Sequence, residues 1–593
     1  MNVHRTLLLT AFLALVPVLG LAAAPSQAPV FGDDPRLDRA VTYDAKGITL
    51  TQVCADLTRK TGVILAAGTD DADWTVYDRK IIAHVNEMKL RDLMRETASI
   101  VRFDWAREGE SGDWTYRLHQ TDEQRREEQS LRSAAEDAAT RKFREKRKNA
   151  LSDLVNLGSL SEEDARKLKT TDPWRYVLAT EPLGAGIARF LTSVPEAGNA
   201  FVQGLEVGLP VSRLAPDLQA TVRGIAESYD SLTQSIGVSE DHSDLLARFD
   251  RLQITINRSR TRSGDDVLSE SLLGSISIGA GSEQFDVPLF DPSSAVGRAF
   301  GTAIVDLRSG VSREEVAARL QETMKQAVGV NAGPNRTPSR DTSSDPGLRK
   351  SIRLFEVDVN ATLPMTLQSL AINAKLNVIS DYFPGNATTI LHGERPLGEQ
   401  LEVISTAFDS NWEKSGNVVR FRDKQWFRKR AWEVAEAWIQ YWISRAKVNE
   451  GLLLEDFVQI GNLSDDQIDH AILTNRHLAG YGAGEAARNR SILRFYALLT
   501  EDQRGKLGAS SLPVSSLHDG QWEALRKALS SKGAAYVAAE KGSQTIRLTY
   551  SDKSVGEYQF LFHPGNGQPP IVFKLTSGVI YEPADETGLP GAR

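Results

Sequence analysis

The segment Val155–Asp164 reads VNLGSLSEED, and Val458–Gln467, 303 residues further along the chain, reads VQIGNLSDDQ. A second pair of segments has the same spacing of 303 residues, from LPVSRL at Leu209–Leu214 to LPVSSL at Leu512–Leu517. Two separate matches at one spacing favour a tandem duplication. So long a period is typical of duplicated domains, because solenoid repeats are only about 20–50 residues long.

The two halves are joined by Val330–Gly347, which is rich in Asn, Pro, Ser, Gly and Asp and lacks hydrophobic periodicity. This composition predicts a linker. The whole chain has 593 residues, and chains longer than about 250–300 residues usually form several domains. We expect an α+β multidomain protein, in which each half has a small βαβ-type module, a helical region and a short antiparallel sheet.

Each half opens with the same alternation of strands and amphipathic helices. The first half has strands at Val41–Asp44, Val63–Ala66 and Trp114–Leu118, with helical spacing at Leu50–Leu57 and Leu90–Thr97. The second has strands at Phe355–Val359, Val378–Ser380 and Val418–Phe421, with helical spacing at Leu363–Leu370 and Leu397–Ile404. A tryptophan, Trp105 or Trp412, follows each second helix. We expect both in cores, so that Trp412→Ala unfolds the second module and leaves the first folded.

A family resemblance rests on the first helix and its flanking strands. ITLTQVCADLTRKTGVIL at Ile48–Leu65 resembles the short N-terminal module of secretins and TonB-dependent receptors, the STN or secretin N-domain. ATLPMTLQSLAINAKLNVIS at Ala361–Ser380 is similar, with Asn377 in place of the helix-ending Gly62. The resemblance implies a βαβ-type protein-interaction domain without catalytic residues. Because neither full family architecture is present, it implies the module alone, not secretion or receptor activity.

The N-terminus has the order of a secretory signal peptide. Arg5 supplies a positive charge, Thr6–Leu21 is almost wholly apolar, and Ala22–Ala24 offers small residues for cleavage. A membrane anchor is the alternative, but the apolar run contains Pro17 and is shorter than the roughly 20 residues of a spanning helix. We therefore expect an extracytoplasmic protein, periplasmic or secreted.

Composition narrows the classes of partner. The apolar fraction of 41% and the charged fraction of 25% are those of an ordinary soluble globular protein. A net charge of -8, spread along the chain, gives no concentrated basic face for a nucleic acid. No transmembrane span is expected in the mature chain, since the most apolar later segment, Leu183–Val211, contains Arg189, Glu196 and Glu206.

The remaining segments predict helices followed by short strands. Thr121–Leu154 is highly charged and lacks Pro and Gly, which favours a long solvated helix. In Phe427–Val448, an aromatic stripe containing Trp438 and Trp442 is expected to pack into a core rather than a partner groove. Antiparallel strands are expected at Leu252–Asn257, Ser275–Ile278, Phe285–Leu289, Thr545–Tyr550, Tyr558–His563 and Ile571–Leu575. The predicted organisation is a signal peptide at 1–28, STN-like modules at 36–120 and 351–425, helical regions at 121–250 and 426–540, a small β/α region at 251–329, a linker at 330–350 and a small antiparallel sheet at 541–585.

Motifs for catalysis, metals and cofactors are missing from the sequence. His470 and His477 lack a third ligand, so surface or core histidines are favoured over a zinc site. The glycines of Gly480–Gly484 favour a helix–helix turn over a phosphate cradle. Adjacent acids such as Asp33 and Asp34 are expected to be solvated. The only cysteine, at position 54, follows a helical apolar pattern that predicts a buried side chain rather than a reactive thiol. No catalytic, cofactor-binding or metal-ligating residue is predicted.

These observations favour an exported, non-enzymatic interaction or structural protein of the bacterial cell envelope, with protein partners. An envelope hydrolase acting on wall or surface polymers, with a site assembled from scattered residues, is an alternative; a small-ligand sensor using a cleft between the halves is another. Partner binding by strand addition would use an edge strand. The candidate edges are Val41–Asp44, Trp114–Leu118, Phe355–Val359 and Val418–Phe421. The alternative for these edges is that the neighbouring helical regions cover them.

Overall fold

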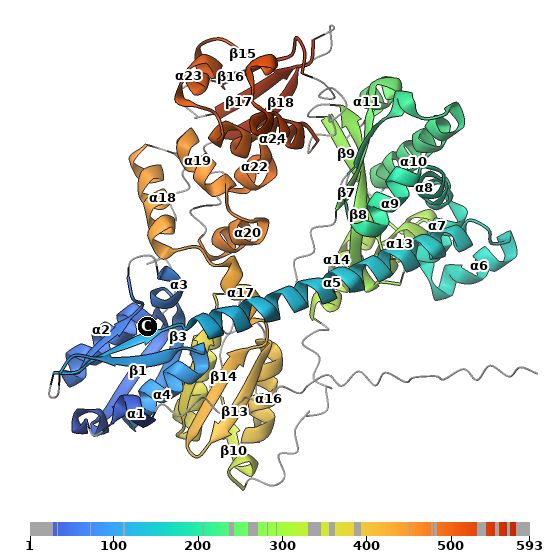
Figure 1. Cartoon of the computed structure of the whole chain (residues 1–593). Coiled ribbons are helices and arrows are strands. Elements are labelled where there is room, and N and C mark those ends of the chain that lie inside the picture. The colour runs from blue at the N-terminus through green and yellow to red at the C-terminus, as the bar shows by residue number, and fades with distance from the viewer. Residues whose placement is uncertain are drawn as a thin grey trace, which may run out of the picture. The chain divides into compact units, whose positions relative to one another are not determined.

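The structure is a computed structural model, a mixed α+β fold with several small sheets (Figure 1). It describes residues 28–32, 34–70, 73–110, 113–205, 207–235, 242–258, 271–280, 283–291, 293–329, 346–354, 362–384, 393–449, 451–475, 478, 483–530, 541–551, 557–565 and 570–576. The predicted signal peptide, apart from Ala28, lies outside these residues, as do most of the linker, Phe355–Val359 and His477. Two compact units are present: unit 1 is Met1–Arg125, Pro364–Tyr382 and Trp412–Arg422, and unit 2 is Arg126–Leu363, Phe383–Asn411 and Asp423–Arg593.

Unit 1 takes its elements from both predicted modules. The first contributes α1 (Ala28–Phe31), the 3-10 turn η1 (Pro35–Asp38), β1 (Ala40–Thr49), α2 (Leu50–Thr61), β2 (Ile64–Ala67), α3 (Trp74–Tyr77), β3 (Lys80–Lys89), α4 (Leu90–Val101), β4 (Asp104–Glu108) and β5 (Thr115–His119). The second contributes α15 (Leu363–Ala374), β11 (Asn377–Tyr382), β13 (Ser410–Ser415) and β14 (Val418–Asp423). The strand β3 departs from the sequence-based prediction, which leaves Lys80–Lys89 unassigned.

One sheet joins the two modules. Its strand order is β1-β3-β11-β14-β13, and a second sheet has the order β2-β5-β4. The joint is an antiparallel ladder between β3 and β11, running from the pair His84–Val378 to the pair Lys80–Tyr382. The fully buried Ile379 of β11 belongs to the same hydrophobic core as Leu50 of α2. The two module segments therefore share backbone hydrogen bonds and part of a core.

Local chemistry explains where the first helix of each module begins and ends. Thr49 caps α2 in a capping box with Gln52, and Gly62 ends it in the left-handed conformation with φ 74°. In the second module, Lys375 adopts the left-handed conformation, with φ 56°. The prediction that Asn377 replaces Gly62 is therefore wrong, because Asn377 is already the first residue of β11.

The first region of unit 2 contains the long predicted helix, which is confirmed as α5 (Asp122–Leu157). It continues through α6 (Glu162–Thr171), α7 (Pro173–Thr180), α8 (Pro182–Ser193), α9 (Pro195–Gln203), β6 (Val207–Pro210), η2 (Val211–Arg213), α10 (Pro216–Ser235), α11 (Ser243–Ala247), η3 (Phe249–Arg251), β7 (Gln253–Arg258), β8 (Leu272–Ala280), β9 (Glu283–Phe290), α13 (Ala295–Arg308) and α14 (Arg313–Gly329). The strands form an antiparallel sheet in the order β6-β7-β8-β9. Its apolar side chains and those of the helices form one cluster, here called the first core.

The second region of unit 2 ends in a sheet with the same antiparallel order, β15-β16-β17-β18. Its elements are η5 (Pro346–Arg349), β10 (Ser351–Arg353), β12 (Glu394–Pro396), α16 (Leu397–Ala407), α17 (Trp426–Trp432), α18 (Glu436–Val448), α19 (Leu454–Gly461), α20 (Asp465–Thr474), α22 (Ala483–Ala497), α23 (Glu501–Ala509), β15 (Leu512–Pro513), η6 (Val514–Ser516), α24 (Asp519–Ser530), β16 (Thr545–Ser551), β17 (Glu557–His563) and β18 (Ile571–Thr576). The apolar cluster from Ile439 to Leu575 is here called the second core.

Several elements of unit 2 recur at the spacing of the sequence repeat. Helices α6 and α20 begin at Glu162 and Asp465, and the 3-10 turns η2 and η6 begin at Val211 and Val514; both pairs lie 303 residues apart. Ser161 caps α6, and Ser464 caps α20. The sequence similarity thus coincides with matching helix starts and matching sheet order.

The predicted aromatic stripe is only partly buried. A break after α17 lets α18 start at Glu436, and from there Ile439 and Trp442 enter the second core. Trp438 remains 47% exposed, and its neighbour Tyr441 is 42% exposed. The expectation that the whole stripe packs into a core is therefore wrong for Trp438. Among the described residues, no helix has both the length and the apolar character needed to cross a membrane.

Candidate functional site

If the modules bind protein partners by strand addition, the binding site is an open sheet edge. β1, which contains the predicted edge Val41–Asp44, is the outer strand of the five-stranded sheet. The predicted edges Trp114–Leu118 and Val418–Phe421 fall instead on the inner strands β5 and β14. These two predictions are wrong because each closing strand pairs in parallel with β2 or β11, which leaves β4 and β13 outermost. Phe355–Val359 lies outside the described residues.

Hydrogen bonds in β11 fix the direction of the backbone groups across the sheet. The Asn377 N–H donates to the Asn417 carbonyl at 2.9 Å, on the side of β14. Because successive residues of a strand point their N–H and C=O groups to opposite sides, Val378 faces β3. Val378 lies opposite His84, so these two residues form a hydrogen-bonded pair of the antiparallel ladder.

The same alternation identifies the outward groups of β1. If His84 faces β11, its neighbour Ala83 faces β1, where it lies opposite Ala45. Ala45 therefore faces β3, and the N–H and C=O groups of Asp44 and Lys46 point away from the sheet. Within the described residues no strand lies on that side of β1. This edge has the unpaired polar groups that a further strand would bind.

Charged side chains surround the β1 edge. The Lys60 ammonium, from α2, donates to the Thr42 carbonyl at 3.1 Å and lies 5.3 Å from the centre of the Tyr43 ring. Lys46 Nζ lies 3.7 Å from Asp44 Oδ2. Lysines at an edge hinder uncontrolled strand pairing. The edge thus combines a lysine cap at Thr42 with outward backbone groups at Asp44 and Lys46.

The β2 edge is capped by α2. Gly68 N–H donates to the Leu118 carbonyl of β5 at 2.9 Å, so by alternation Leu65 faces away from β5. Leu65 N–H donates to Thr58 Oγ1 at 2.9 Å, and the same hydroxyl donates to the Leu65 carbonyl at 3.5 Å. Thr61 Oγ1 accepts from the Val63 N–H at 3.2 Å. Two threonine hydroxyls therefore occupy positions that a neighbouring strand would take.

Arginines of β14 fasten the second module to α4. Arg422 Nε donates to the Ile100 carbonyl at 3.1 Å, near the negative end of the helix dipole. Burial lowers the pKa of Arg422 to about 10. Arg420 forms ion pairs with Glu96, at 3.1 Å, and Glu413, at 3.4 Å. These contacts stabilise the joint between the modules, so Arg420 and Arg422 have structural roles.

One histidine–carboxylate pair has the residue types of a general base. His84 Nδ1 contacts Asp44 Oδ1 across the β1–β3 ladder. The second ring nitrogen, Nε2, is buried and has no hydrogen-bond partner in the described part of the chain, and His84 is only 6% exposed. A general base must reach the proton that it removes. This pair is therefore better suited to joining two strands than to acid–base catalysis.

Asp34 is a buried anchor rather than a solvated acid. It is 6% exposed, accepts from Arg36 Nη2 at 2.7 Å and accepts from the Tyr116 hydroxyl at 3.0 Å. The hydrogen bond from Arg36 lowers the pKa of Asp34 below its usual value. The prediction of solvation is wrong here because Arg36 and Tyr116 replace the water around the carboxylate.

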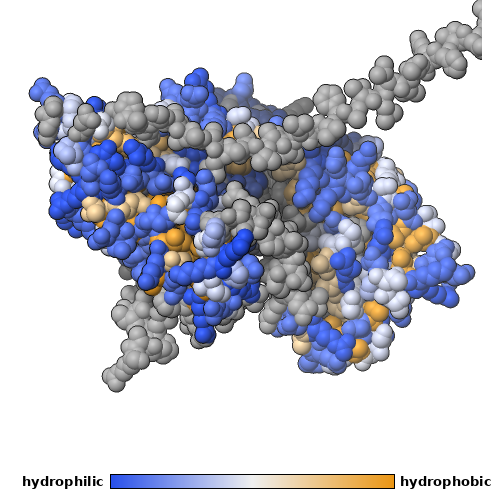
Figure 2. All heavy atoms as spheres, turned by 90° about the horizontal axis from the view of Figure 1, so that it is seen from below, coloured by the Kyte–Doolittle hydropathy of each residue, from blue (hydrophilic) through white to orange (hydrophobic). Residues whose placement is uncertain are grey.

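Cys54 and His470, the other candidate reactive residues, lie within helices. Cys54 is buried, as predicted, and burial raises the pKa of its thiol to about 12. His470 lies in α20. Among the described residues, no three His, Cys, Asp or Glu side chains lie close enough together to hold a metal ion. On the face in Figure 2, hydrophobic residues lie in patches among hydrophilic ones, as on ordinary globular proteins.

Comparisons with protein-family models, curated proteins and solved structures found no match.

Proposed function

We propose that the chain is an exported, non-enzymatic interaction protein of the bacterial cell envelope, and that its STN-like modules bind protein partners. The observation that carries this proposal is the β1 edge, with the backbone groups of Asp44 and Lys46 directed away from the sheet. The same sheet already contains an added strand, since β3 of one module pairs with β11 of the other. A partner strand at β1 would extend this arrangement by one strand.

Three sequence-based expectations underlie the proposal: the module resemblance, the duplication and export. The module resemblance is supported by the parallel pairs β2–β5 and β11–β14, each of which is expected of a βαβ-type module. The duplication is supported by the spacing of 303 residues between matching helices and by the matching order of the two four-stranded sheets. Export rests on the signal-peptide pattern of residues 1–28, and mass spectrometry of the native protein should find them removed.

The test places proline on each of two neighbouring residues of β1. Lys46→Pro removes an outward N–H, whereas Ala45→Pro removes an N–H that faces β3. Partners captured from envelope extract by the unaltered chain would be identified first and then titrated against each variant. We expect Lys46→Pro to keep its thermal stability and lose at least tenfold in affinity, while Ala45→Pro loses stability.

Hydrogen exchange supplies the second readout. In the complex, the amides of Asp44 and Lys46 should exchange more slowly than in the chain alone, because a partner strand would bond them. Unchanged exchange at both amides, together with full affinity of Lys46→Pro, would reject strand addition at β1. A complex that instead protects Trp438 and Tyr441 would move the interaction surface to α18.

A further inference from the structure

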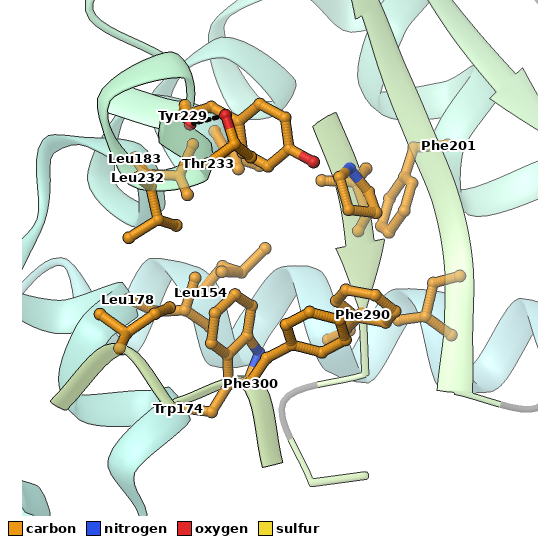
Figure 3. Close-up of a pocket in the computed structure, with 16 residues that line it drawn as sticks. Leu154, Trp174, Leu178, Leu183, Phe201, Tyr229, Leu232, Thr233, Phe290 and Phe300 are labelled. Atoms are coloured by element: carbon orange, nitrogen blue, oxygen red, sulfur yellow. Dashed lines mark hydrogen bonds between the residues drawn. The ribbon is translucent and has the colours of Figure 1, made fainter. Parts of the chain in front are cut away.

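The first core contains a partly open cavity of about 170 Å³. Its walls come from α5, α7, α8, α9, α10, α13 and the strands β8 and β9. Figure 3 shows Leu154, Trp174 and Phe300 along one side of the space, with Leu183 and Tyr229 along the other. Closely packed cores seldom contain voids much larger than a water molecule. A space of this size is therefore a feature that needs an explanation.

The lining selects against charge. Every one of the described residues that line the cavity is apolar or aromatic, apart from Thr233, whose hydroxyl already donates to backbone carbonyls of α10. Burial raises the pKa of Tyr229 to about 12, so its hydroxyl is neutral at physiological pH. An ion would lose its hydration here without gaining a charged partner from the wall.

Aromatic rings form one wall. Phe290 stacks on Phe300 with ring centres 5.2 Å apart, and Trp174 meets Phe290 edge to face at 6.2 Å. Phe290, Phe300 and Tyr229 are partly exposed, whereas Trp174 is only 6% exposed. The lining thus runs from a buried indole to a rim that solvent reaches. Aromatic walls favour flat rings, which pack against them face to face or edge to face.

One polar atom in the wall is left unsatisfied by the described residues. Trp174 Nε1 is a buried donor, and none of them supplies it with a hydrogen-bond acceptor. Buried donors are nearly always paired, because an unpaired one loses its bond to water without replacement. The indole is held firmly, since Gly297 and Gly301 of α13 let that helix approach Trp174 too closely for any larger side chain. A ligand that brought an acceptor within hydrogen-bond distance of Trp174 Nε1 would satisfy this donor.

We propose that the cavity binds an uncharged, single-ring aromatic molecule that carries one hydrogen-bond acceptor. Its size sets the first limit, because an apolar cavity of about 150 Å³ holds benzene. Its apolar lining sets the second, which is the absence of charge. Trp174 Nε1 sets the third, which is the acceptor. This site is independent of the strand-addition site at β1.

The second core has larger side chains at positions equivalent to those of the first core. The two sheets align through Leu209–Ile254 in the first and Leu512–Ile546 in the second, which are equivalent cross-strand pairs. From these pairs the ladders match buried residues of the first core, Ile276, Ile278 and Val287, with Phe560, Phe562 and Phe573 of the second. The cavity-lining Leu154 matches Phe457, 303 residues later. The first core thus has smaller side chains at four equivalent buried positions.

The test uses 4-fluoroacetophenone, a neutral ring with one carbonyl acceptor, and follows its fluorine NMR signal during titration with the chain. We expect saturable binding with a dissociation constant of roughly 0.1–1 mM, a range typical of ligands with so few atoms. Fluorobenzene, which lacks the acceptor, should bind about fivefold more weakly. The charged 4-fluorobenzoate should bind at least tenfold more weakly.

Matched variants locate the site. Leu154→Phe places in the cavity the side chain that the second core has at the equivalent position, and it should weaken binding at least tenfold. Phe457→Leu makes the reverse change in the second core and should leave the affinity within about twofold. Trp174→Phe should remove the preference for the ketone over fluorobenzene. Circular dichroism would check folding, with Ile187→Phe as the second filling variant if Leu154→Phe unfolds. Absence of saturable binding, or equal affinity in the filled variant, would overturn the proposal.

Discussion

β2 and β11 hold the same position in their modules but differ in what lies beside them. Each follows the first helix of its module, and each pairs in parallel with the closing strand. β11 has β3 on its other side, whereas β2 is the outer strand of its sheet. The strands also differ in burial: the first five residues of β11 are buried, while Ile64 of β2 is 44% exposed.

Residues at equivalent positions of the preceding helices, α2 and α15, account for the difference between the β2 and β11 edges. Helices α2 and α15 begin at Leu50 and Leu363, and their strands begin at Ile64 and Asn377, so both pairs lie 313 residues apart. At this spacing, the edge-capping residues Thr58 and Thr61 match Ala371 and Ala374. Alanine has no hydroxyl with which to bond a strand. A threonine on the helix can thus hydrogen-bond the backbone groups of a strand edge, whereas alanine at that position leaves the edge free to pair with another strand.

The largest expected effect comes from Trp412→Ala. Trp412 is 7% exposed, and removing a buried aromatic side chain costs roughly 3–5 kcal/mol. The sequence alone predicts that the first module stays folded, but β11 supplies one neighbour of β3. We now expect β3 to lose protection together with the second module, measured by hydrogen exchange at Ile82 and His84. Unchanged protection there would favour independent modules.

Asp34→Asn should have a smaller effect and should alter the pH dependence. The carboxylate fastens β5 through Tyr116, whereas the equivalent residue of β14 is Val419. Losing a hydrogen bond to a charged group costs about 1–3 kcal/mol. Since the folded-state pKa of Asp34 lies below the unfolded value of about 3.9, the carboxylate stabilises the fold above that value. This stabilisation disappears as the pH falls through the folded-state pKa.

Acid unfolding titrations of the two proteins provide the measurement. The stability difference between the unaltered chain and the Asp34→Asn variant should be constant near neutral pH and should shrink below about pH 4. A difference that is independent of pH down to complete unfolding would assign the loss to packing instead.

Thr58→Ala tests the edge comparison directly. It should cost about 1–2 kcal/mol, because the Leu65 N–H loses its acceptor. It should also promote concentration-dependent association through β2, measured by sedimentation velocity. Thr58→Ser keeps a hydroxyl and is the matched control, so it should remain monodisperse under conditions where the alanine variant associates.

The reciprocal change, Ala371→Thr, should have the smallest effect. The backbone groups of Val378 already pair with His84, so a new hydroxyl near them has little to replace. We expect a change of less than about 1 kcal/mol in unfolding free energy. A larger loss, with reduced protection of β3, would show that the hydroxyl competes with the strand.

Sequence patterns predict those features that depend on neighbouring residues. Ser464 with Gln467 and Thr500 with Gln503 have the residue types and spacing of capping boxes and form them in the structure. The predicted strands of the second four-stranded sheet are present as β16, β17 and β18. Helix caps and strand alternation are local, and a short window contains their whole signal.

Strand order and the cavity cannot be predicted from such short windows, because they depend on residues that are distant in the sequence. The sequence-based prediction leaves Lys80–Lys89 unassigned although Ile81 and Ile82 are β-branched, and without β3 the joint to β11 has no partner to be predicted from. The inner positions of β5 and β14 depend on pairings between distant segments. Likewise, Leu154 and Trp174 meet only through helix packing, so no spacing along the chain indicates a cavity between them.

The β3–β11 ladder can form only after β11 has been synthesised, long after β3. The side chain of Asn377 accepts a hydrogen bond from Asn86, 291 residues earlier in the chain. At synthesis rates of about 5–20 residues per second, that separation takes roughly 15–60 s. Until β11 has been made, β3 is a strand edge without its final neighbour, the condition in which chains most readily join one another. During those roughly 15–60 s, the nascent chain depends on whatever keeps β3 from pairing with a different strand.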